Sequence, residues 1–389
     1  MRDSPGTGIV CIGGYWEGFS SRRQHFMKRF AERCLEVLFV EPSESWPALF
    51  SGSRMSPLLA PRTRRISPGL TVLTPTLALP LRHNRVVSLV NHRAWALQIR
   101  RALRKLELEP GVLWVYDPRY ADAVPAIKPS SIVFDMVDDY LPEEYGGWRV
   151  RRGTTWLLEN SDVCIFTTPV LEAKYGSLSK AHLVVPNGFD PERFNTSPTP
   201  APDDLPSIGG PILGFVGTLF RHIDFDILSK AAVLARQRGG ILIVIGAVEP
   251  SGREGAAKVE AAGGLMLGPR PNTELRAYIQ RFSLCLAPFV KNDVAASVSP
   301  LKVYEYLACG RPVYATGLES LRWDPAGASV FQGSGMSLES ALDRALALSR
   351  RDLQAFSAAA SGATWDRRFE DLCAGLRRIG AAPGTWLAG

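Results

Sequence analysis

Short apolar runs that end at glycine or aspartate recur along this chain, and helical stretches such as residues 24–34 separate them. Runs of this length, bounded by turn or helix signals, are typical of strands that are buried on both faces of a parallel sheet. Their alternation with helices predicts a doubly wound α/β domain. The runs in the first half are 9–12, 37–40, 112–116, 132–134 and 163–166.

The same pattern restarts after residues 198–210, a stretch rich in proline, aspartate, glycine and serine that is typical of an exposed linker. A helix is expected at 226–238, between the first two of the new runs. Since 389 residues suit two domains, we predict an α/β fold of two Rossmann-like domains facing each other across a cleft. The runs in the second half are 212–216, 241–245, 284–287 and 313–315.

Composition narrows the class of protein. Hydrophobic residues make up 46% and charged residues 21%, as in globular chains. No apolar run is long enough to cross a bilayer, and residues 1–8 lack the features of a signal peptide, so we expect a cytoplasmic protein. A net charge of +7 suits an anionic partner. Zinc-finger spacing and an aromatic RNP pattern are both missing, so we expect no nucleic-acid partner.

Six cysteines occur, and no two lie at metal-ligand spacing. Several stand inside apolar runs, as Cys11 and Cys164 do. We interpret them as core residues in a reducing compartment and predict no metal site.

Ligands of such sheets lie beyond the carboxyl ends of the strands. The residues that follow predicted strands are Gly13, Gly14, Asp117, Asp135, Gly217, Thr218, Gly246 and Pro288. We expect them near the cleft.

Three segments carry a family resemblance. They are 184–194 (VVPNGFDPERF), 214–219 (GFVGTL) and 300–313 (PLKVYEYLACGRPV). Together they resemble the group 1, family 4-like retaining glycosyltransferases with the GT-B fold, and the resemblance covers nearly the whole chain. Residues 22–25 and 38–42 are similar to those of a bacterial branch with members in cell-wall or surface polysaccharide synthesis.

This resemblance implies a division of labour between the domains. Residues 1–188 would form the acceptor domain and 189–364 the nucleotide-sugar domain, while a final helix at about 365–389 would cross back onto the first domain. The implied reaction moves a sugar from a UDP- or GDP-type donor to a glycan or lipid-linked acceptor. It would proceed with retention and without a metal, and the donor would be a substrate rather than a cofactor.

The third segment also has a physical interpretation of its own. A short helix is predicted at 303–309, with Ser299, Pro300 and Leu301 at its start. A helix N-terminus can hold a diphosphate, and Lys302 adds a full positive charge there. Glu305 can accept hydrogen bonds from ribose hydroxyls. The alternative is a surface ion pair between Lys302 and Glu305 within one helix.

The sequence departs from the family pattern at three positions. Ser297 stands where many members have the first of two glutamates, and Thr218 and Ile223 stand where many have arginine and lysine. Arg221 is the predicted substitute phosphate ligand, although it could instead be a solvated arginine. These departures leave open a non-catalytic homologue that binds nucleotide or polysaccharide, and a sugar-nucleotide epimerase of the same fold is a further alternative.

Candidates for catalysis lie in the first half. A carboxylate at a strand end could orient the acceptor hydroxyl or take its proton, and we predict Asp117 and Asp138 for this role ahead of Asp135 and Asp139. The alternative is a helix cap or a turn. Gly13 and Gly14 would permit close approach of donor or acceptor, or would form a plain tight turn.

Residues 82–108 combine basic and apolar side chains. Such a helix could lie on an anionic membrane surface, at the inner face of the plasma membrane. The alternative is a domain helix with a solvated charged face. The cations are Arg82, Arg85, Arg93, Arg100, Arg101, Arg104 and Lys105, and the apolar residues are Val86, Leu89, Val90, Trp95, Leu97, Ile99, Leu103 and Leu106.

Overall fold

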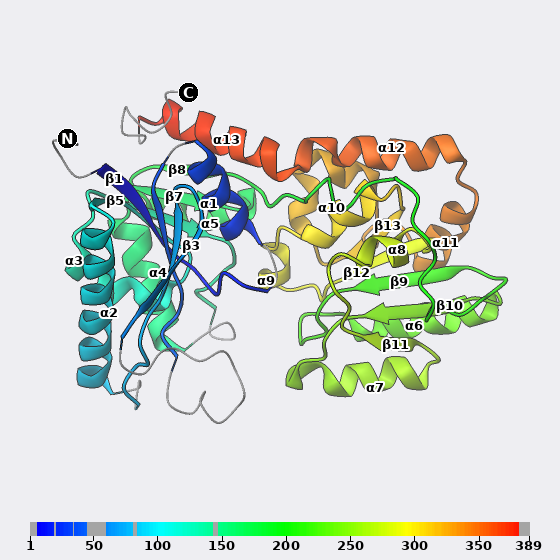
Figure 1. Ribbon diagram of the computed structural model, residues 1–389. Helices are drawn as coiled ribbons and strands as arrows, with labels where there is room; N and C mark the ends of the chain where they lie inside the picture. Colours follow the sequence, from blue (N-terminus) through cyan, green and yellow to red (C-terminus); the bar gives the residue numbers. More distant parts are fainter. Residues whose placement is uncertain are drawn as a thin grey trace. The chain divides into compact units, whose positions relative to one another are not determined.

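The computed structural model describes residues 6–18, 21–33, 35–44, 60–80, 84–142 and 147–380. The chain forms two compact units, each with its own sheet (Figure 1). The first comprises Met1–Val185 and Phe369–Gly389, and the second Pro186–Arg368. The last helix, α13 (Trp365–Arg378), therefore begins in the second unit and continues in the first.

The first unit contains an eight-stranded sheet in the order β3-β4-β2-β1-β5-β6-β7-β8. Neighbouring strands are parallel except β3 and β4, which pair antiparallel. The strands are β1 (Gly6–Ile12), β2 (Val37–Val40), β3 (Arg62–Ser67), β4 (Leu70–Thr74), β5 (Leu108–Val115), β6 (Ser131–Met136), β7 (Val163–Phe166) and β8 (His182–Val184). The helices are α1 (Arg22–Glu32), α2 (Arg85–Lys105), η2 (Pro118–Ala123), α3 (Val124–Ile127), α4 (Trp148–Asn160), α5 (Pro169–Tyr175) and η3 (Gly176–Leu178).

Side-chain alternation along the strands gives the first sheet two buried faces. Val10 and Ile12 of β1 belong to the same core cluster as Trp95 of α2. On α1, Phe30 packs against Trp114 of β5, with ring centroids 5.4 Å apart, and against Phe369 of α13, at 4.8 Å. The returning end of α13 is thus part of the core of the first unit.

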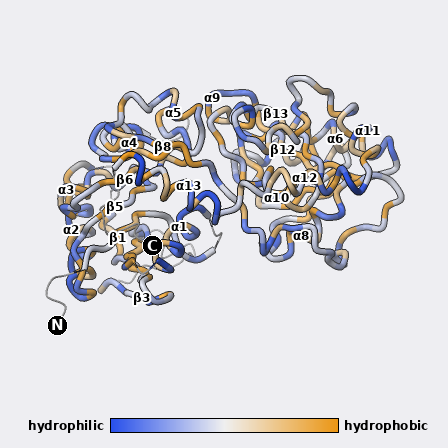
Figure 2. Tube along the Cα trace, turned by 90° about the horizontal axis from the view of Figure 1, so that it is seen from above, coloured by the Kyte–Doolittle hydropathy of each residue, from blue (hydrophilic) through white to orange (hydrophobic). Residues whose placement is uncertain are grey.

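The second unit contains a six-stranded sheet, parallel throughout, in the order β11-β10-β9-β12-β13-β14. Apolar residues run through the interior of both units (Figure 2). The strands are β9 (Ile212–Val216), β10 (Ile241–Ile245), β11 (Leu265–Gly268), β12 (Leu284–Pro288), β13 (Val313–Thr316) and β14 (Val330–Gln332). The helices are α6 (Phe225–Gln237), η4 (Pro250–Gly252), α7 (Arg253–Ala261), α8 (Leu275–Ile279), α9 (Asp293–Ala296), α10 (Leu301–Ala308), η5 (Glu319–Arg322), η6 (Pro325–Ser329), α11 (Leu338–Leu346), α12 (Arg350–Ala360) and η7 (Ser361–Ala363).

The predicted pair of doubly wound α/β domains is confirmed by these two sheets. Among the helices in the described ranges, none has the length and apolar character needed to cross a membrane.

Candidate functional site

The N-terminus of α10 lies beside the glycine loop that follows β9. Gly217 has a φ of +145°, a conformation that side-chain-bearing residues rarely adopt. A Cβ added there would lie 2.8 Å from Lys302 Nζ. The missing side chain of Gly217 therefore makes room for the Lys302 ammonium at the carboxyl end of the sheet.

Lys302 is held by aromatic rings rather than by a carboxylate. Its Nζ lies 4.4 Å from the ring centroid of Phe215 in β9 and 5.0 Å from that of Phe289, which follows β12. Burial lowers the pKa of Lys302 to about 8, although the charge of Glu305 acts in the opposite direction. The ammonium is thus desolvated without being neutralised.

Glu305 lies one turn further along α10 and is half-buried. Burial raises its pKa to about 7, against the opposing effects of Lys302 and Arg193. Within the described part of the chain, no ion pair of 4.0 Å or less joins Glu305 to Lys302. The predicted alternative of a surface ion pair within one helix does not match this geometry.

Backbone and side-chain hydrogen bonds fix the start of α10. Asn187 donates its backbone N–H to Ser299 Oγ and its side-chain Nδ2 to Ser299 O, both at 3.0 Å. Arg368 Nε donates to Asn187 O at 3.1 Å. Pro300 is the N-cap of α10 and offers no side-chain hydrogen bond, so the cap leaves helix N–H groups for another acceptor. Sequence reasoning did not assign Asn187 or Arg193 to this site, although both stand in the 184–194 segment.

The positions that depart from the family pattern differ in their surroundings. Thr218 is exposed, whereas Ile223 is 1% exposed and forms a bridge with Phe289. Ile223 is therefore a core residue. Ser297 is 1% exposed, and its hydroxyl donates to Asp293 O at 3.0 Å, so this position offers no charge. Arg221 is exposed, with Nε 3.3 Å from Nε2 of the buried His222.

In the first unit, Gly13 and Gly14 follow β1 and lie under Arg23. A Cβ on Gly14 would clash with Arg23 Nη1, so this guanidinium can cover the loop only because the position is glycine. The loop is held in place, since Trp16 N donates to Glu41 Oε1 at 3.0 Å and Gln24 Nε2 donates to Tyr15 O at 3.1 Å.

Asp117 caps η2. Its Oδ1 accepts the backbone N–H of Arg119 at 3.0 Å, and the Arg119 guanidinium reaches both carboxylate oxygens, at 2.9 Å from Oδ1 and 2.6 Å from Oδ2. The predicted alternative of a helix cap describes this arrangement.

The other three aspartates differ in what surrounds them. Asp135 is fully buried within β6, rather than beyond the strand end as predicted, and it accepts Arg22 Nε at 3.0 Å and Trp114 Nε1 at 3.3 Å. Asp139 is 1% exposed and accepts Lys174 Nζ at 3.0 Å and Tyr175 Oη at 2.7 Å. Asp138 lies two residues beyond the end of β6 and is half-buried.

The potential metal ligands and the cysteine thiols are the remaining reactive side chains. In the ranges that the structure describes, no group of three or more His, Cys, Asp and Glu side chains could hold a metal ion. Cys11, Cys164, Cys285, Cys309 and Cys373 are free and buried. The sixth cysteine, Cys34, lies outside the described residues.

Known glycosyltransferases resemble this chain in sequence. Residues 210–346 match the family model for "Glycosyl transferases group 1". The 2-deoxystreptamine glucosyltransferase of Streptomyces kanamyceticus is 28% identical over 304 residues, which cover 67% of this chain and 74% of that protein. A protein of Bacillus subtilis (strain 168), provisionally named a teichuronic acid biosynthesis glycosyltransferase, is 28% identical over 144 residues, or 36% of this chain and 35% of its own.

Solved structures share the fold over nearly the whole chain. The sucrose-phosphate synthase of Thermosynechococcus elongatus has a TM-score of 0.69 at 17% identity and covers 97% of this chain and 100% of its own. The Anabaena protein HepE, solved with UDP and glucose, has a TM-score of 0.63 at 13% identity and covers 96% of this chain and 98% of its own. The chain is therefore a glycosyltransferase with the GT-B fold, and the segment that matches the group 1 glycosyl transferase model lies in its second unit.

Proposed function

We propose that this glycosyltransferase takes its sugar from a UDP- or GDP-activated donor held by the second unit. The observation that carries this proposal is the Lys302 ammonium, which lies between two phenylalanine rings at the Gly217 loop and has no carboxylate paired with it in the described residues. The UDP in the HepE structure supports the choice of nucleotide class.

Sugar transfer requires that the negative charge on the leaving diphosphate be stabilised. Lys302 and the N-terminus of α10, formed by Ser299, Pro300 and Leu301, supply positive charge and N–H donors where the leaving group gains negative charge. Glu305 accepts hydrogen bonds from the ribose. Gly217 and Thr218 allow the donor to approach the protein backbone closely. Arg221 adds a second, exposed cation. In this scheme the charge comes from the chain itself, so transfer proceeds without a metal.

The acceptor side belongs to the first unit in this proposal. Of the two predicted carboxylates we carry Asp138 forward, because it is half-buried beyond the end of β6, whereas Asp117 is the cap of the 3-10 helix η2. Asp138 orients the acceptor hydroxyl or takes its proton. Gly13 and Gly14 present their loop, together with Arg23, to the donor or the acceptor. Transfer proceeds with retention of the anomeric configuration, which NMR of the first-formed product would test.

A nucleotide panel tests the donor site. A ligand bound by the folded state raises the melting temperature by mass action, so UDP, GDP, ADP, CMP and dTDP compounds are compared by thermal shift. We expect a shift with a UDP or GDP compound that Lys302→Met removes and that Lys230→Met, an exposed lysine of α6, leaves unchanged. An undiminished shift in Lys302→Met would remove the site from the proposal.

Product analysis separates the alternatives. Sugar transfer that needs an added acceptor and continues in EDTA supports the proposed reaction. Conversion of the sugar nucleotide without any acceptor would identify an epimerase, and binding without turnover would identify a non-catalytic homologue.

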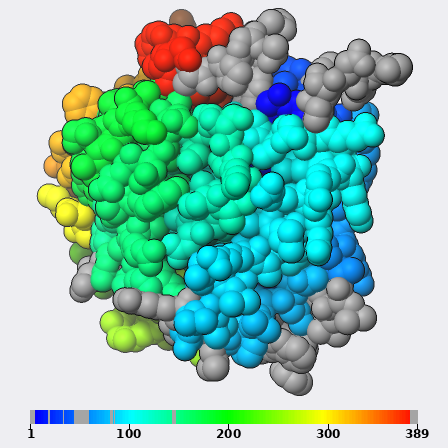
Figure 3. Space-filling model, turned by 90° about the vertical axis from the view of Figure 1, so that its left-hand side faces the viewer, coloured from blue at the N-terminus to red at the C-terminus, as the bar shows by residue number. Residues whose placement is uncertain are grey.

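A role in cell-envelope polysaccharide synthesis, with a glycan or lipid-linked acceptor, is the finer part of the proposal. Its support is the name of the Bacillus subtilis relative and the surface of α2. Val86 is 70% exposed, and Leu89, Val90 and Leu97 are 44–46% exposed on the same helix as five outward-facing cations. The surface that includes this cyan segment is visible in Figure 3. The cations are Arg93, Arg100, Arg101, Arg104 and Lys105.

Trp95, Ile99 and Leu103 do not belong to that surface, because they are buried in the core, and Arg82 lies outside the described residues. Flotation with anionic liposomes tests the membrane proposal. Glutamine in place of Arg93, Arg100 and Arg101 should reduce flotation, whereas the same change at Arg350 and Arg351 of α12 should not. Equal flotation of both variants would exclude α2 as the membrane contact.

A further inference from the structure

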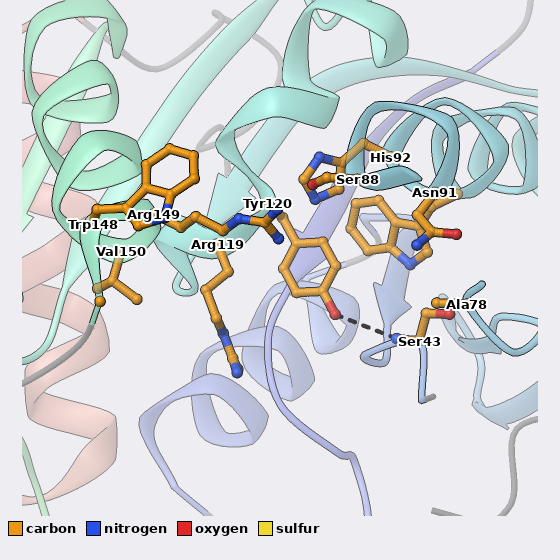
Figure 4. Close-up of a pocket in the computed structure, with 12 residues that line it drawn as sticks. Ser43, Ala78, Ser88, Asn91, His92, Arg119, Tyr120, Trp148, Arg149 and Val150 are labelled. Atoms are coloured by element: carbon orange, nitrogen blue, oxygen red, sulfur yellow. Dashed lines mark hydrogen bonds between the residues drawn. The ribbon is translucent and has the colours of Figure 1, made fainter. Parts of the chain in front are cut away.

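A cavity of about 350 Å³ lies within the first unit, and none of the residues that line it is assigned to the donor. Ser88, Asn91, His92 and Trp95 of α2 form one wall, and Arg119 and Tyr120 of η2 form another. The first turn of α4, Gly147–Val150, closes a third side (Figure 4). Cavities of this size commonly bind small molecules through an apolar lining and a few polar groups.

The apolar part of the lining is aromatic. Trp95 and Tyr120 stack with ring centroids 4.4 Å apart and an interplanar angle of 24°. The Tyr120 hydroxyl is fixed in turn, because it accepts Ser43 N at 3.3 Å (Figure 4). This pair offers a rigid surface to an aliphatic chain or a ring.

Two donors in the lining lack acceptors. Trp95 is 2% exposed, and neither its Nε1 nor the buried Nη2 of Arg149 has a hydrogen-bond partner in the described structure. Buried donors are nearly always paired, so each calls for an acceptor that a ligand can supply. Because one of the donors belongs to a guanidinium, an anionic acceptor is favoured.

The start of α4 adds to this preference. Gly147 caps the 13-residue helix without a side-chain hydrogen bond, and Gly147, Trp148, Arg149 and Val150 line the cavity, so the positive end of the helix dipole lies at the cavity wall. The lining residues in the described ranges include no carboxylate. Two aspartates nearby form ion pairs. Asp117 pairs with Arg119 at 2.6 Å, and Asp122 pairs with Arg152 at 3.0 Å.

The cavity opens toward exposed apolar residues. Trp148 is 43% exposed at its edge, and Leu89, 45% exposed, lines an adjoining hollow together with Trp148 and Arg149. A ligand whose apolar part is longer than the cavity would therefore continue along an apolar surface.

We propose that this cavity binds an amphipathic organic phosphate, with the phosphate at Arg149, Trp95 Nε1 and the N-terminus of α4, and the apolar chain against Trp95, Tyr120 and Trp148. This inference deepens the acceptor side of the proposed function, on which the lipid-linked case rests, and it is separate from the nucleotide-sugar site on the second unit. A lipid-linked phosphate and a free phosphate share the head-group chemistry, and the experiment distinguishes them.

Isothermal titration calorimetry on the full chain compares octyl phosphate, octanol and inorganic phosphate, below the concentration at which octyl phosphate forms micelles. We expect octyl phosphate to bind at least about tenfold more tightly than either of the others, since only it satisfies both halves of the site. Arg149→Gln should weaken octyl phosphate about tenfold or more, because a charge-assisted hydrogen bond is lost. Trp95→Phe, which keeps the stacked ring and removes the donor, should weaken it less.

Arg62→Gln is the matched control, because it removes the same charge from an exposed position of β3 in the same unit, outside the lining. Equal binding of octyl phosphate and inorganic phosphate, or an Arg149→Gln variant that binds octyl phosphate as the parent does, would overturn the proposal. Nucleotide thermal shifts measured on the same variants report folding of the second unit. A chain that binds octyl phosphate but no nucleotide would contradict the proposed donor site and leave the cavity assignment intact.

Discussion

The two units differ in whether the charged side chains near the carboxyl ends of their sheets form ion pairs. In the first unit, Asp117, Asp135 and Asp139 each accept hydrogen bonds from a basic side chain within 3.0 Å. In the second unit, Lys302 and Glu305 stand half-buried on one helix without forming such a pair among the described residues. Removing one partner of a buried ion pair destabilises a fold strongly, because the other charge is left uncompensated, whereas a desolvated charge that already lacks a partner costs stability and is retained where a ligand supplies the partner. The comparison therefore separates structural residues from candidate ligand contacts.

The largest expected effect is on the buried pair of Arg22 and Asp135. Asp135→Asn leaves the 3%-exposed Arg22 guanidinium without its carboxylate and should lower the free energy of unfolding of the first unit by about 3–5 kcal/mol. Urea unfolding followed by tryptophan fluorescence measures this. Asp138→Asn, in the same segment but only half-buried, should cost less, about 1 kcal/mol, because its carboxylate is less desolvated than that of Asp135. Equal stability of the two variants would erase the distinction.

Lys302→Met should have the reverse pattern. Loss of the ammonium should lower kcat/KM for the donor by a factor of about 100 to 1,000, as expected when one charge that stabilises a leaving group is removed. Unfolding stability should stay the same or rise, because an uncharged, flexible side chain then lies between Phe215 and Phe289. Steady-state kinetics and thermal denaturation measure the two effects. A large loss of stability would show that Lys302 is structural after all.

The central strands could be predicted from sequence because they are continuous apolar runs. β2, β7, β9 and β10 have the bounds that the sequence predicts. The edge of the first sheet was missed, since β3 (RTRRIS) is largely exposed and carries no apolar run. Short strands at or near the sheet edges, β8, β11 and β14, were missed for the related reason that their apolar runs are brief.

Side-chain partners were the harder part of the site. The sequence placed Asp135 beyond a strand because it could not show Arg22, 113 residues earlier, as the partner of a buried carboxylate. Likewise, Asn187 meets Ser299 across 112 residues. The α10 motif was found because its helix start, its cation and its carboxylate are adjacent in the chain. The cavity was not found, because α2, η2 and α4 each contribute only part of it.

The pH dependence of donor binding should show both charges of α10. Nucleotide binding needs a protonated Lys302 and an ionised Glu305, so kcat/KM should fall below the Glu305 pKa of about 7 and above the Lys302 pKa of about 8, roughly tenfold per pH unit on each side. Glu305→Gln should remove the acid limb and keep the alkaline limb. A profile of the parent enzyme that is flat from pH 6 to 9 would show that neither group titrates in the free enzyme.

The free energy of unfolding should also depend on pH through Glu305 and Lys302. Each pKa is shifted in the direction opposite to the shift that an ion pair would cause. The pKa of Glu305 is raised from 4.5, so its contribution is present below about pH 4.5 and is lost as the pH rises through about 7. The pKa of Lys302 is lowered from 10.5, so its contribution is present above about pH 10.5 and is lost as the pH falls through about 8. Between pH 7 and 8 the folded state therefore carries both costs, and this is the range in which bound nucleotide should raise the melting temperature most.

The smallest expected effect is at Asp117. Asp117→Ala removes the cap of η2 and the partner of Arg119. The free energy of unfolding should fall by about 1 kcal/mol, because η2 is a short helix and the Arg119 side chain is 64% exposed. If the carboxylate is occupied by this structural role, turnover should fall by less than about threefold, far less than in Asp138→Asn. Steady-state kinetics on the two variants compare them directly. A drop in turnover of about two orders of magnitude in Asp117→Ala, at an unchanged melting temperature, would identify Asp117 as catalytic. A basic partner would then no longer be enough to identify a strand-end carboxylate as a structural residue.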